Sequence, residues 1–209
     1  MKLRGLYAVT PDLADTADLL RRAGQALLGG ACLVQYRNKP AGATLRREQA
    51  AALLALCRRH GVPLVINDDL LLALAVGADG AHLGREDGDL GAARAALGPN
   101  RLLGISCYDE LERAREARRI GADYVAFGSF FASSTKPAAV RAPLTLPAAA
   151  KAELGLPVCA IGGITLRNAP QLIAAGADLL AVITDLFEAP DIRARAAAYT
   201  SLFTERVTP

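Results

Sequence analysis

Charged side chains of this 209-residue chain gather directly after short apolar runs that are typical of β-strands. Arg37 and Lys39 follow one such run, Asp68 and Asp87 come shortly after two others, and Lys136 follows a fourth. Arginine offers a planar fork and lysine a compact charge to phosphate oxygens, and aspartate oxygens are typical ligands of Mg²⁺. If these five side chains share one rim, they are suited to a polyphosphate with a divalent metal.

Hydroxyl groups and glycines at other strand ends suit phosphate as well. Ser106 ends one predicted strand, and Ser133 and Thr135 lie in the polar stretch "ASSTK" behind another. A Gly–Gly pair at 162–163 and Thr184 follow the last two strands, where backbone N–H groups of barrel enzymes commonly bind phosphate. The rim is therefore expected to hold two anions, a diphosphate with Mg²⁺ on one side and a monophosphate on the other.

Each of these features also has a purely structural interpretation. Asp68 and Asp69 could cap the following helix, a lone basic residue at a strand end is usually solvated, and a Gly–Gly pair is often a tight turn. His82 is interpreted as a packed or hydrogen-bonded structural residue, and His60, beside Gly61, as a favourable charge at a helix end. These interpretations weaken if the charged side chains converge, because an unpaired set of charges on one rim needs a ligand.

A repeated motif shows how the chain could bring the charged residues together. "GGAC" at Gly29, "GADG" at Gly77, "GADY" at Gly121 and "GADL" at Gly176 each follow an Ala/Leu/Arg-rich helical stretch and precede a short apolar run. We expect each glycine to end its helix in the left-handed conformation.

Strands and helices alternate along the whole chain. The predicted strands are 6–10, 32–37, 61–68, 80–84, 98–106, 123–128, 155–163 and 179–184. The predicted helices are 17–29, 45–60, a segment after 69, 88–98, 109–120, 144–154, 166–175 and 191–203. Near-continuous apolar strands indicate a parallel sheet covered on both faces. The sequence predicts a single-domain (β/α)8 TIM barrel over 1–209, with a doubly wound open sheet as the alternative.

Composition narrows the class of function. A net charge of only +3, without a basic stripe interleaved with aromatic residues, argues against nucleic-acid binding. No apolar run reaches membrane-spanning length, and we expect no signal peptide, because no long apolar run follows the basic residues at the start. Four cysteines without a CxxC pair are interpreted as reduced thiols: Cys32, Cys57, Cys107 and Cys159. We expect a cytoplasmic protein that acts on small molecules, and a homodimer is kept as a candidate assembly.

Six motifs, in this order and at barrel-like spacing, make the chain resemble the thiamine phosphate synthase family. They are "VQYRNK", "VINDD", "GADGAHLGREDGD", "GISC", "GADYVAFGSFFASSTK" and "AIGGITLRNAPQLIAAGAD", and the resemblance covers nearly the whole chain. It implies a (β/α)8 barrel transferase with Mg²⁺ as cofactor. The implied reaction joins 4-amino-5-hydroxymethyl-2-methylpyrimidine diphosphate to hydroxyethylthiazole phosphate, which gives thiamine phosphate and pyrophosphate.

The resemblance also implies a role for each residue of the rim. The residues that would contact the pyrimidine diphosphate are Gln35, Arg37, Lys39 and Asn67. Those that would bind Mg²⁺ are Asp68 and Asp87. Ser106 and Lys136 would contact the pyrophosphate, and Ser133 and Thr135 the pyrimidine and phosphate groups. The thiazole phosphate would be held by Gly163, Ile183 and Thr184.

The implied chemistry requires no protein nucleophile. The catalytic residues would be Arg37, Lys39, Ser106 and Lys136, which with Mg²⁺ would neutralise the leaving diphosphate and favour a pyrimidine carbocation. The thiazole nitrogen would then attack the cation. Residues 129–143 would form a lid whose Thr135 and Lys136 close on the diphosphate and exclude water.

The chain departs from the family pattern at several positions. The family usually has Thr at Ser133, Pro at Ser129, Gln at Arg85 and Ser at Thr184, so a hydroxyl is retained at 133 and 184. Asp185 stands where a small apolar residue is common. Its charge would oppose a bound phosphate unless the side chain points toward a helix.

Three other functions fit the same barrel. A thiazole tautomerase would use a histidine in the loop after the sixth strand, where this chain has Ser129 and no histidine. A non-catalytic barrel would bind the two phosphates without turnover, and Asp185 is its best support. A phosphosugar isomerase or aldolase would need a Glu base or a Schiff-base Lys at a strand end, and the sequence shows neither.

Overall fold

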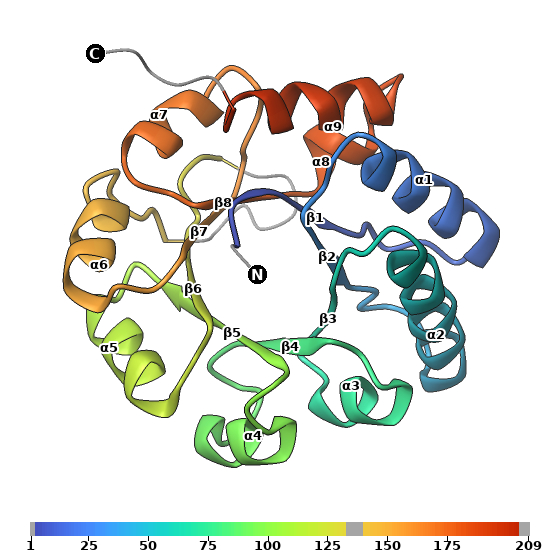
Figure 1. Ribbon diagram of the computed structural model, residues 1–209, viewed down its shortest axis with the longest axis horizontal. Helices are drawn as coiled ribbons and strands as arrows, with labels where there is room; N and C mark the ends of the chain where they lie inside the picture. Colours follow the sequence, from blue (N-terminus) through green and yellow to red (C-terminus); the bar gives the residue numbers. More distant parts are fainter. Residues whose placement is uncertain (1–2, 133–139, 205–209) are drawn as a thin grey trace.

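Eight parallel strands close into a barrel in the order of the chain. The computed structural model describes residues 3–132 and 140–204. Each strand pairs with the next one along the sequence, and β8 pairs with β1 to close the ring (Figure 1). The predicted (β/α)8 barrel is confirmed, and the open sheet is excluded because it would leave two strand edges unpaired.

The elements correspond closely to the predicted segments. The strands are β1 (Gly5–Val9), β2 (Leu33–Tyr36), β3 (Leu64–Asn67), β4 (Gly80–Leu83), β5 (Leu102–Tyr108), β6 (Tyr124–Phe127), β7 (Val158–Ile161) and β8 (Leu179–Val182). The helices are α1 (Thr16–Leu28), α2 (Ala43–Arg59), α3 (Leu70–Val76), α4 (Leu90–Leu97), α5 (Leu111–Ile120), α6 (Leu146–Leu154), α7 (Ala169–Ala174), α8 (Thr184–Phe187) and α9 (Ile192–Ser201). The short α8 is an addition that the pattern did not predict.

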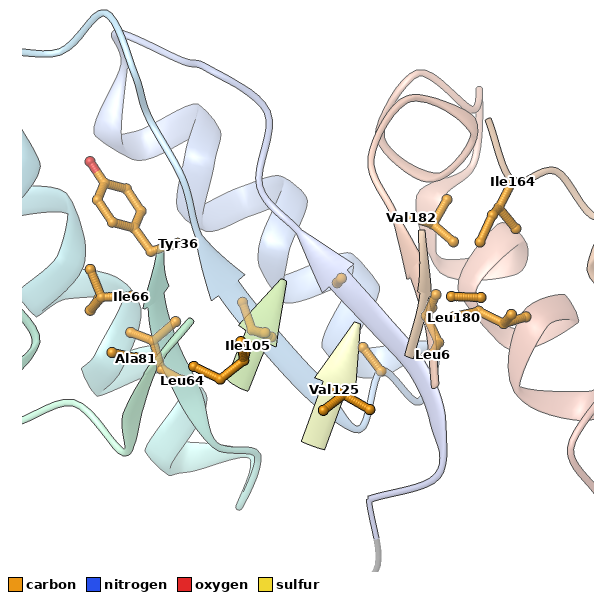
Figure 2. Close-up of a cluster of buried hydrophobic side chains, with 14 of the residues drawn as sticks. Leu6, Tyr36, Leu64, Ile66, Ala81, Ile105, Val125, Ile164, Leu180 and Val182 are labelled. Atoms are coloured by element: carbon orange, nitrogen blue, oxygen red, sulfur yellow. The ribbon is translucent and has the colours of Figure 1, made fainter. Parts of the chain in front are cut away.

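Two apolar layers hold the barrel together. Side chains of alternate strand residues fill the barrel interior, among them Tyr7, Val65 and Tyr124. Their neighbours along the strands point outward and pack under the helices, as Figure 2 shows for Leu6 and Ile66. Because both faces of each strand are covered, apolar residues predominate on both faces, and the strands lack the regular alternation of apolar and polar residues.

The left-handed helix ends are confirmed at two of the four repeats and shifted in another. Gly77 and Gly121 cap their helices with φ of 69° and 90°, and Gly176, one residue beyond the helix cap, has φ of 103°. The prediction is wrong for Gly29, which has φ of −83°. The positive φ falls on Gly30, at 95°, because the first repeat has two glycines and the chain turns at the second.

The aspartate of the "GAD" repeat has a structural function that the pattern did not reveal. The backbone N–H groups of Asp79, Asp123 and Asp178 donate to a carbonyl in the preceding strand, and their carboxylates accept from the N–H of the same residue there. The three partner residues are Leu64, Leu103 and Val158. Each aspartate thus fixes the register of two neighbouring strands near their amino-terminal ends, and so aligns the opposite ends.

Two further features concern the outer surface of the barrel. Helix α9 packs against α1 and β1, so the last helix covers the seam where the barrel closes (Figure 1). In the part of the chain that the structure describes, no helix combines the length and the apolar character needed to cross a membrane.

Candidate active site

The two predicted cations after β2 are positioned by an aspartate of the neighbouring loop. Strand β2 ends at Tyr36, so Arg37 and Lys39 lie in the loop that follows it. Asp12 Oδ1 accepts hydrogen bonds of 2.9 Å from both Arg37 Nη1 and the Lys39 backbone N–H. Lys39 Nζ in turn lies 3.2 Å from Asp68 Oδ2. Arg37 is 13% exposed and Lys39 52% exposed in their side chains, so Lys39 is the more accessible charge.

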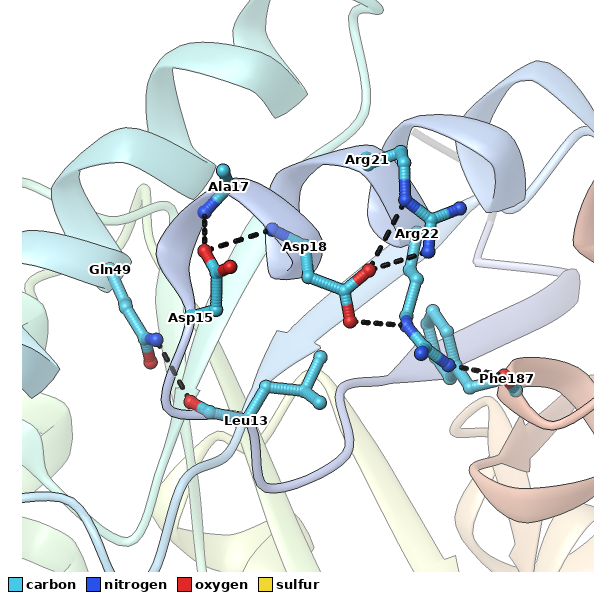
Figure 3. Close-up of polar contacts among 8 residues, drawn as sticks. All are labelled: Leu13, Asp15, Ala17, Asp18, Arg21, Arg22, Gln49 and Phe187. Atoms are coloured by element: carbon cyan, nitrogen blue, oxygen red, sulfur yellow. Dashed lines mark hydrogen bonds and ion pairs between the residues drawn. The ribbon is translucent and has the colours of Figure 1, made fainter.

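A buried polar cluster holds the same two loops rigid. Gln49, on α2, donates through Nε2 to the Leu13 carbonyl at 2.9 Å (Figure 3). Its Oε1 accepts from Asn38 Nδ2 at 2.8 Å and from Tyr36 Oη at 2.9 Å. Because all three side chains are buried, these hydrogen bonds fix the loop that carries the two cations.

Helix α1 joins this region to the far side of the barrel seam. Asp15 caps the helix by accepting from Ala17 N at 2.7 Å (Figure 3). Asp18 pairs with Arg22, whose Nη1 donates to the Phe187 carbonyl at the end of α8 (Figure 3). The rim segments after β1 and β8 are therefore tied to each other through α1.

The two aspartates after β3 have separate functions. Asp69 caps α3 through a 2.9 Å hydrogen bond from Leu72 N and pairs with Arg46, so the helix-cap interpretation is confirmed for Asp69. Asp68 is not the cap. It adopts φ of 60°, a left-handed conformation that is uncommon outside glycine, and its carboxylate faces Lys39. Such backbone strain is often found at functional sites.

Asp87 completes a group of two carboxylates and one ammonium. Its Oδ2 accepts from the Gly84 N–H at 2.6 Å. Partial burial raises the pKa of Asp87, and the nearby carboxylate of Asp68 raises it further, while Lys39 opposes this shift. The predicted convergence of Lys39, Asp68 and Asp87 is therefore found in the structure, with more negative than positive charge among these three side chains.

Gln35 and Ser106 lie at the two ends of a hydrogen-bonded chain through the barrel interior. Gln35 Nε2 lies 2.6 Å from Tyr7 Oη, and Tyr7 Oη lies 2.8 Å from Tyr124 Oη. His82 Nδ1 lies 3.0 Å from Tyr124 Oη, and His82 Nε2 lies 2.9 Å from Ser106 Oγ. His82 is buried and hydrogen-bonded, as predicted.

Glycines after β7 allow the loop after β6 to lie close to the barrel. The N–H groups of Phe130 and Phe131 donate to the carbonyls of Ile161 and Gly162. A Cβ atom on Gly163 would lie 2.1 Å from the Ala132 carbonyl oxygen, so no larger residue fits there. Three predicted site residues of this loop lie outside the described residues: Ser133, Thr135 and Lys136. Their roles and the predicted lid therefore remain predictions.

The end of β8 resolves the question that Asp185 raised. Ile183 precedes α8 and Thr184 begins it. The Asp185 carboxylate accepts from Arg195 Nη1 at 2.8 Å and from Tyr199 Oη at 2.7 Å, both on α9. Burial and this carboxylate raise the pKa of Tyr199, which therefore stays a hydrogen-bond donor. Asp185 thus points toward a helix and has a cationic partner.

Several residues of the candidate site could not be predicted from the sequence, because their hydrogen-bond partners lie far away along the chain. Asp12 is 25 residues from Arg37, and Tyr7 is 117 residues from Tyr124. One local signal was available: Gly104 interrupts the apolar run of β5. A glycine inside a strand often marks a close approach of another group.

Comparisons with known proteins point to one family. A family model described as thiamine monophosphate synthase matches residues 6–186. The thiamine-phosphate synthase of Aromatoleum aromaticum is 60% identical over 97% of this chain and 97% of its own length, and that of an Azoarcus species is 59% identical over 97% and 98%. The solved thiamine phosphate pyrophosphorylase of Pyrococcus furiosus has a TM-score of 0.85, 32% identity, and coverage of 99% of this chain and 98% of that one.

Proposed function

The chain belongs to the thiamine monophosphate synthase family, and from this premise we propose that it joins a pyrimidine diphosphate to a thiazole phosphate. It is a transferase like its relatives. The proposed substrates are 4-amino-5-hydroxymethyl-2-methylpyrimidine diphosphate and hydroxyethylthiazole phosphate, and the products are thiamine phosphate and pyrophosphate.

The observation that carries the proposal is the charge arrangement at the rim. Arg37 is held by Asp12, while Lys39 lies between Asp68 and Asp12. A diphosphate would place its oxygens against the two cations, which can neutralise the charge that develops as it leaves. The same cations would bind the substrate before reaction, so they serve both affinity and rate.

The two carboxylates fit Mg²⁺. Asp68 and Asp87 are close enough to raise the pKa of Asp87, and adjacent like charges with incomplete compensation favour a divalent cation. Among residues 3–132 and 140–204, no three His, Cys, Asp or Glu side chains form a metal cage. Two carboxylates are the usual protein share of a Mg²⁺ site that is completed by phosphate and water. Bound there, Mg²⁺ would supply positive charge to the departing diphosphate.

The protein's own groups would orient the reactants and keep water away. Ser106 and Gln35 are presented by a buried network, so their positions are preorganised. The thiazole phosphate is proposed to bind the backbone around Gly163 and Thr184. Because Asp185 is neutralised by Arg195, it offers little repulsion to that phosphate. This also removes the best support for the non-catalytic alternative.

Pyrophosphate release is the experiment that tests the function. Purified protein would be mixed with both substrates, with either one alone, and with both plus a chelator. We expect release only with both substrates and Mg²⁺, together with thiamine phosphate in equal amount. Tight binding of either phosphate without release would instead indicate a binding protein.

A further inference from the structure

Four hydrogen bonds connect Gln35 to Ser106 through the sealed interior of the barrel. The chain of groups is Gln35, Tyr7, Tyr124, His82 and Ser106, on strands β2, β1, β6, β4 and β5. The first four side chains are buried, between 0% and 6% exposed. Polar groups enclosed in an apolar interior must hydrogen-bond to one another, so each hydrogen in this network has few alternative acceptors.

The amide of Gln35 determines which group donates and which accepts at each hydrogen bond of this network. Its Nε2 faces Tyr7 Oη, and an amide nitrogen can only donate. Burial raises the pKa of both Tyr7 and Tyr124, so each phenol keeps its single hydrogen. Among the residues that the structure describes, Tyr7 Oη hydrogen-bonds only with Gln35 Nε2, which is a donor, and with Tyr124 Oη, so the buried Tyr7 hydrogen has Tyr124 Oη as its acceptor. The Tyr124 hydrogen is then left to donate to His82 Nδ1.

The direction of the hydrogen bond at His82 Nδ1 decides whether the Ser106 hydroxyl hydrogen is available to a ligand. With Nδ1 accepting, the imidazole carries its hydrogen on Nε2 and donates it to Ser106 Oγ, 2.9 Å away. The four links then use one hydrogen each, and the hydroxyl hydrogen of Ser106 is used by none of them. In the opposite tautomer, Ser106 would donate that hydrogen to His82 Nε2.

The backbone of β5 is shaped to permit this contact. In the strand register, Gly104 lies between His82 on β4 and Tyr124 on β6. A Cβ atom on Gly104 would lie 2.3 Å from Tyr124 Oη and 2.6 Å from His82 Nδ1. The His82 and Tyr124 rings stack with centroids 5.6 Å apart in the space that the missing side chain leaves.

We propose that Tyr7, Tyr124 and His82 are positioning residues that fix the tautomer of His82 and thereby point the Ser106 hydroxyl hydrogen at the diphosphate. The inference rests on the proposed function in so far as it names the anion. It extends the site to residues of the barrel interior that do not contact substrate. An anion gains most from a donor that needs no reorientation when the anion arrives.

The tautomer can be read in the free protein, independently of any activity. The chain has only two histidines, so the variant His60→Gln, labelled with ¹⁵N, reports His82 alone. In NMR spectra, the chemical shifts of the two imidazole nitrogens should show Nδ1 unprotonated and Nε2 protonated. A protonated Nδ1 with an unprotonated Nε2 would overturn the proposal, because Ser106 would then donate to His82. A doubly protonated ring would overturn it as well.

Removal of one phenol hydroxyl tests the link to the anion. In Tyr124→Phe, His82 loses the donor to Nδ1, so we expect the other tautomer to gain population. Binding of inorganic pyrophosphate with Mg²⁺ should weaken roughly tenfold, since a hydrogen bond to a charged group is lost. Binding of the thiazole phosphate should not change. Tyr7→Phe should act in the same direction if Tyr124→Phe does not fold.

A double variant separates this role from a general loss of packing. If the network acts through Ser106, then Tyr124→Phe combined with Ser106→Ala should bind pyrophosphate no more weakly than Ser106→Ala alone. If the double variant instead showed the product of the affinity losses of the two single variants, the proposal would be overturned. If the wild-type protein lacked synthase activity, the tautomer and the pyrophosphate binding would still be measurable, so the two failures are distinguishable.

Discussion

Asp87 combines a proposed benefit for metal binding with a cost in stability. Its pKa is raised, so the folded state binds a proton more tightly than the unfolded state does. The penalty is absent below the ordinary pKa of aspartate, develops as the pH rises from there through the raised pKa, and is complete above the raised pKa. Asp87→Asn should therefore leave the melting temperature near pH 7 unchanged or slightly higher, because the amide oxygen can still accept from Gly84 N.

The same substitution should reduce Mg²⁺-dependent pyrophosphate release by at least about tenfold, since one of two carboxylates is lost. Mg²⁺ with pyrophosphate should raise the melting temperature of the wild type more than that of the variant. Asp69→Asn is the matched control, because asparagine caps a helix as well as aspartate does. A normal Mg²⁺ response in Asp87→Asn would remove Asp87 from the metal site.

Cys32 provides a second test at the scale of one residue. It is the least buried of the four cysteines, and burial raises its pKa to about 11. The thiolate is the reactive form, so alkylation of the folded protein should keep accelerating up to about pH 11. Mass spectrometry of protein treated with iodoacetamide at increasing pH measures this rate. A rate that levels off near pH 8.5, as for free cysteine, would contradict the prediction.

Single residues show which part of a site the sequence can reveal. The convergence of Lys39, Asp68 and Asp87 could be predicted because all three follow apolar strands whose carboxyl ends meet on one rim of a barrel. Their partners could not: Asp12 lies in another loop, and Tyr7 and Tyr124 resemble ordinary core residues until the barrel places their hydroxyl groups together. Polar function inside an apolar interior depends on the strand register, which the local pattern does not determine.

At the scale of elements, the "GAD" aspartates act as clamps between neighbouring strands. Asp79 accepts from Leu64 N at 2.8 Å, and removal of its carboxylate would leave that N–H without its acceptor. We expect Asp79→Ala to lower the free energy of unfolding by about 1–3 kcal/mol. Urea denaturation followed by circular dichroism would measure the change.

Asp109→Ala is a suitable control, because Asp109 is exposed and should contribute less than about 0.5 kcal/mol. Equal stability of the two variants would show that the clamp is unimportant. Asp79→Asn should fall between them, since the amide oxygen still accepts a hydrogen bond but without the added strength of a charge.

Elements were predicted well and their ends less well, for a physical reason. The apolar runs were long enough to identify every strand, but hydrogen bonding to neighbours ends β2 at Tyr36 and places Arg37 in a loop. The repeat predicted a left-handed turn at Gly29, yet Gly30 adopts it, because either glycine tolerates a positive φ. Helix α8 was missed because a single turn has no periodicity to detect.

For the whole molecule, the decisive feature is closure of the ring at the β1–β8 seam beneath α9. Tyr199 of α9 is fully buried, and its hydroxyl group donates to Asp185 after β8. Tyr199→Ala should lower the free energy of unfolding by about 3–5 kcal/mol, as expected for loss of a large buried ring. Tyr199→Phe retains the ring and should cost only about 1–2 kcal/mol for the lost hydrogen bond.

The decisive measurement for closure is whether the barrel interior unfolds together with the helices. The chain has no tryptophan, so near-ultraviolet dichroism reports its five tyrosines, four of them fully buried: Tyr7, Tyr36, Tyr124 and Tyr199. Far-ultraviolet dichroism reports the helices. Because β8 pairs with β1, damage to α9 should shift both transitions in Tyr199→Ala by the same amount. A helix signal that is lost before the tyrosine signal would mean that the ring stays closed without α9, and that the seam is held by β1 and β8 alone.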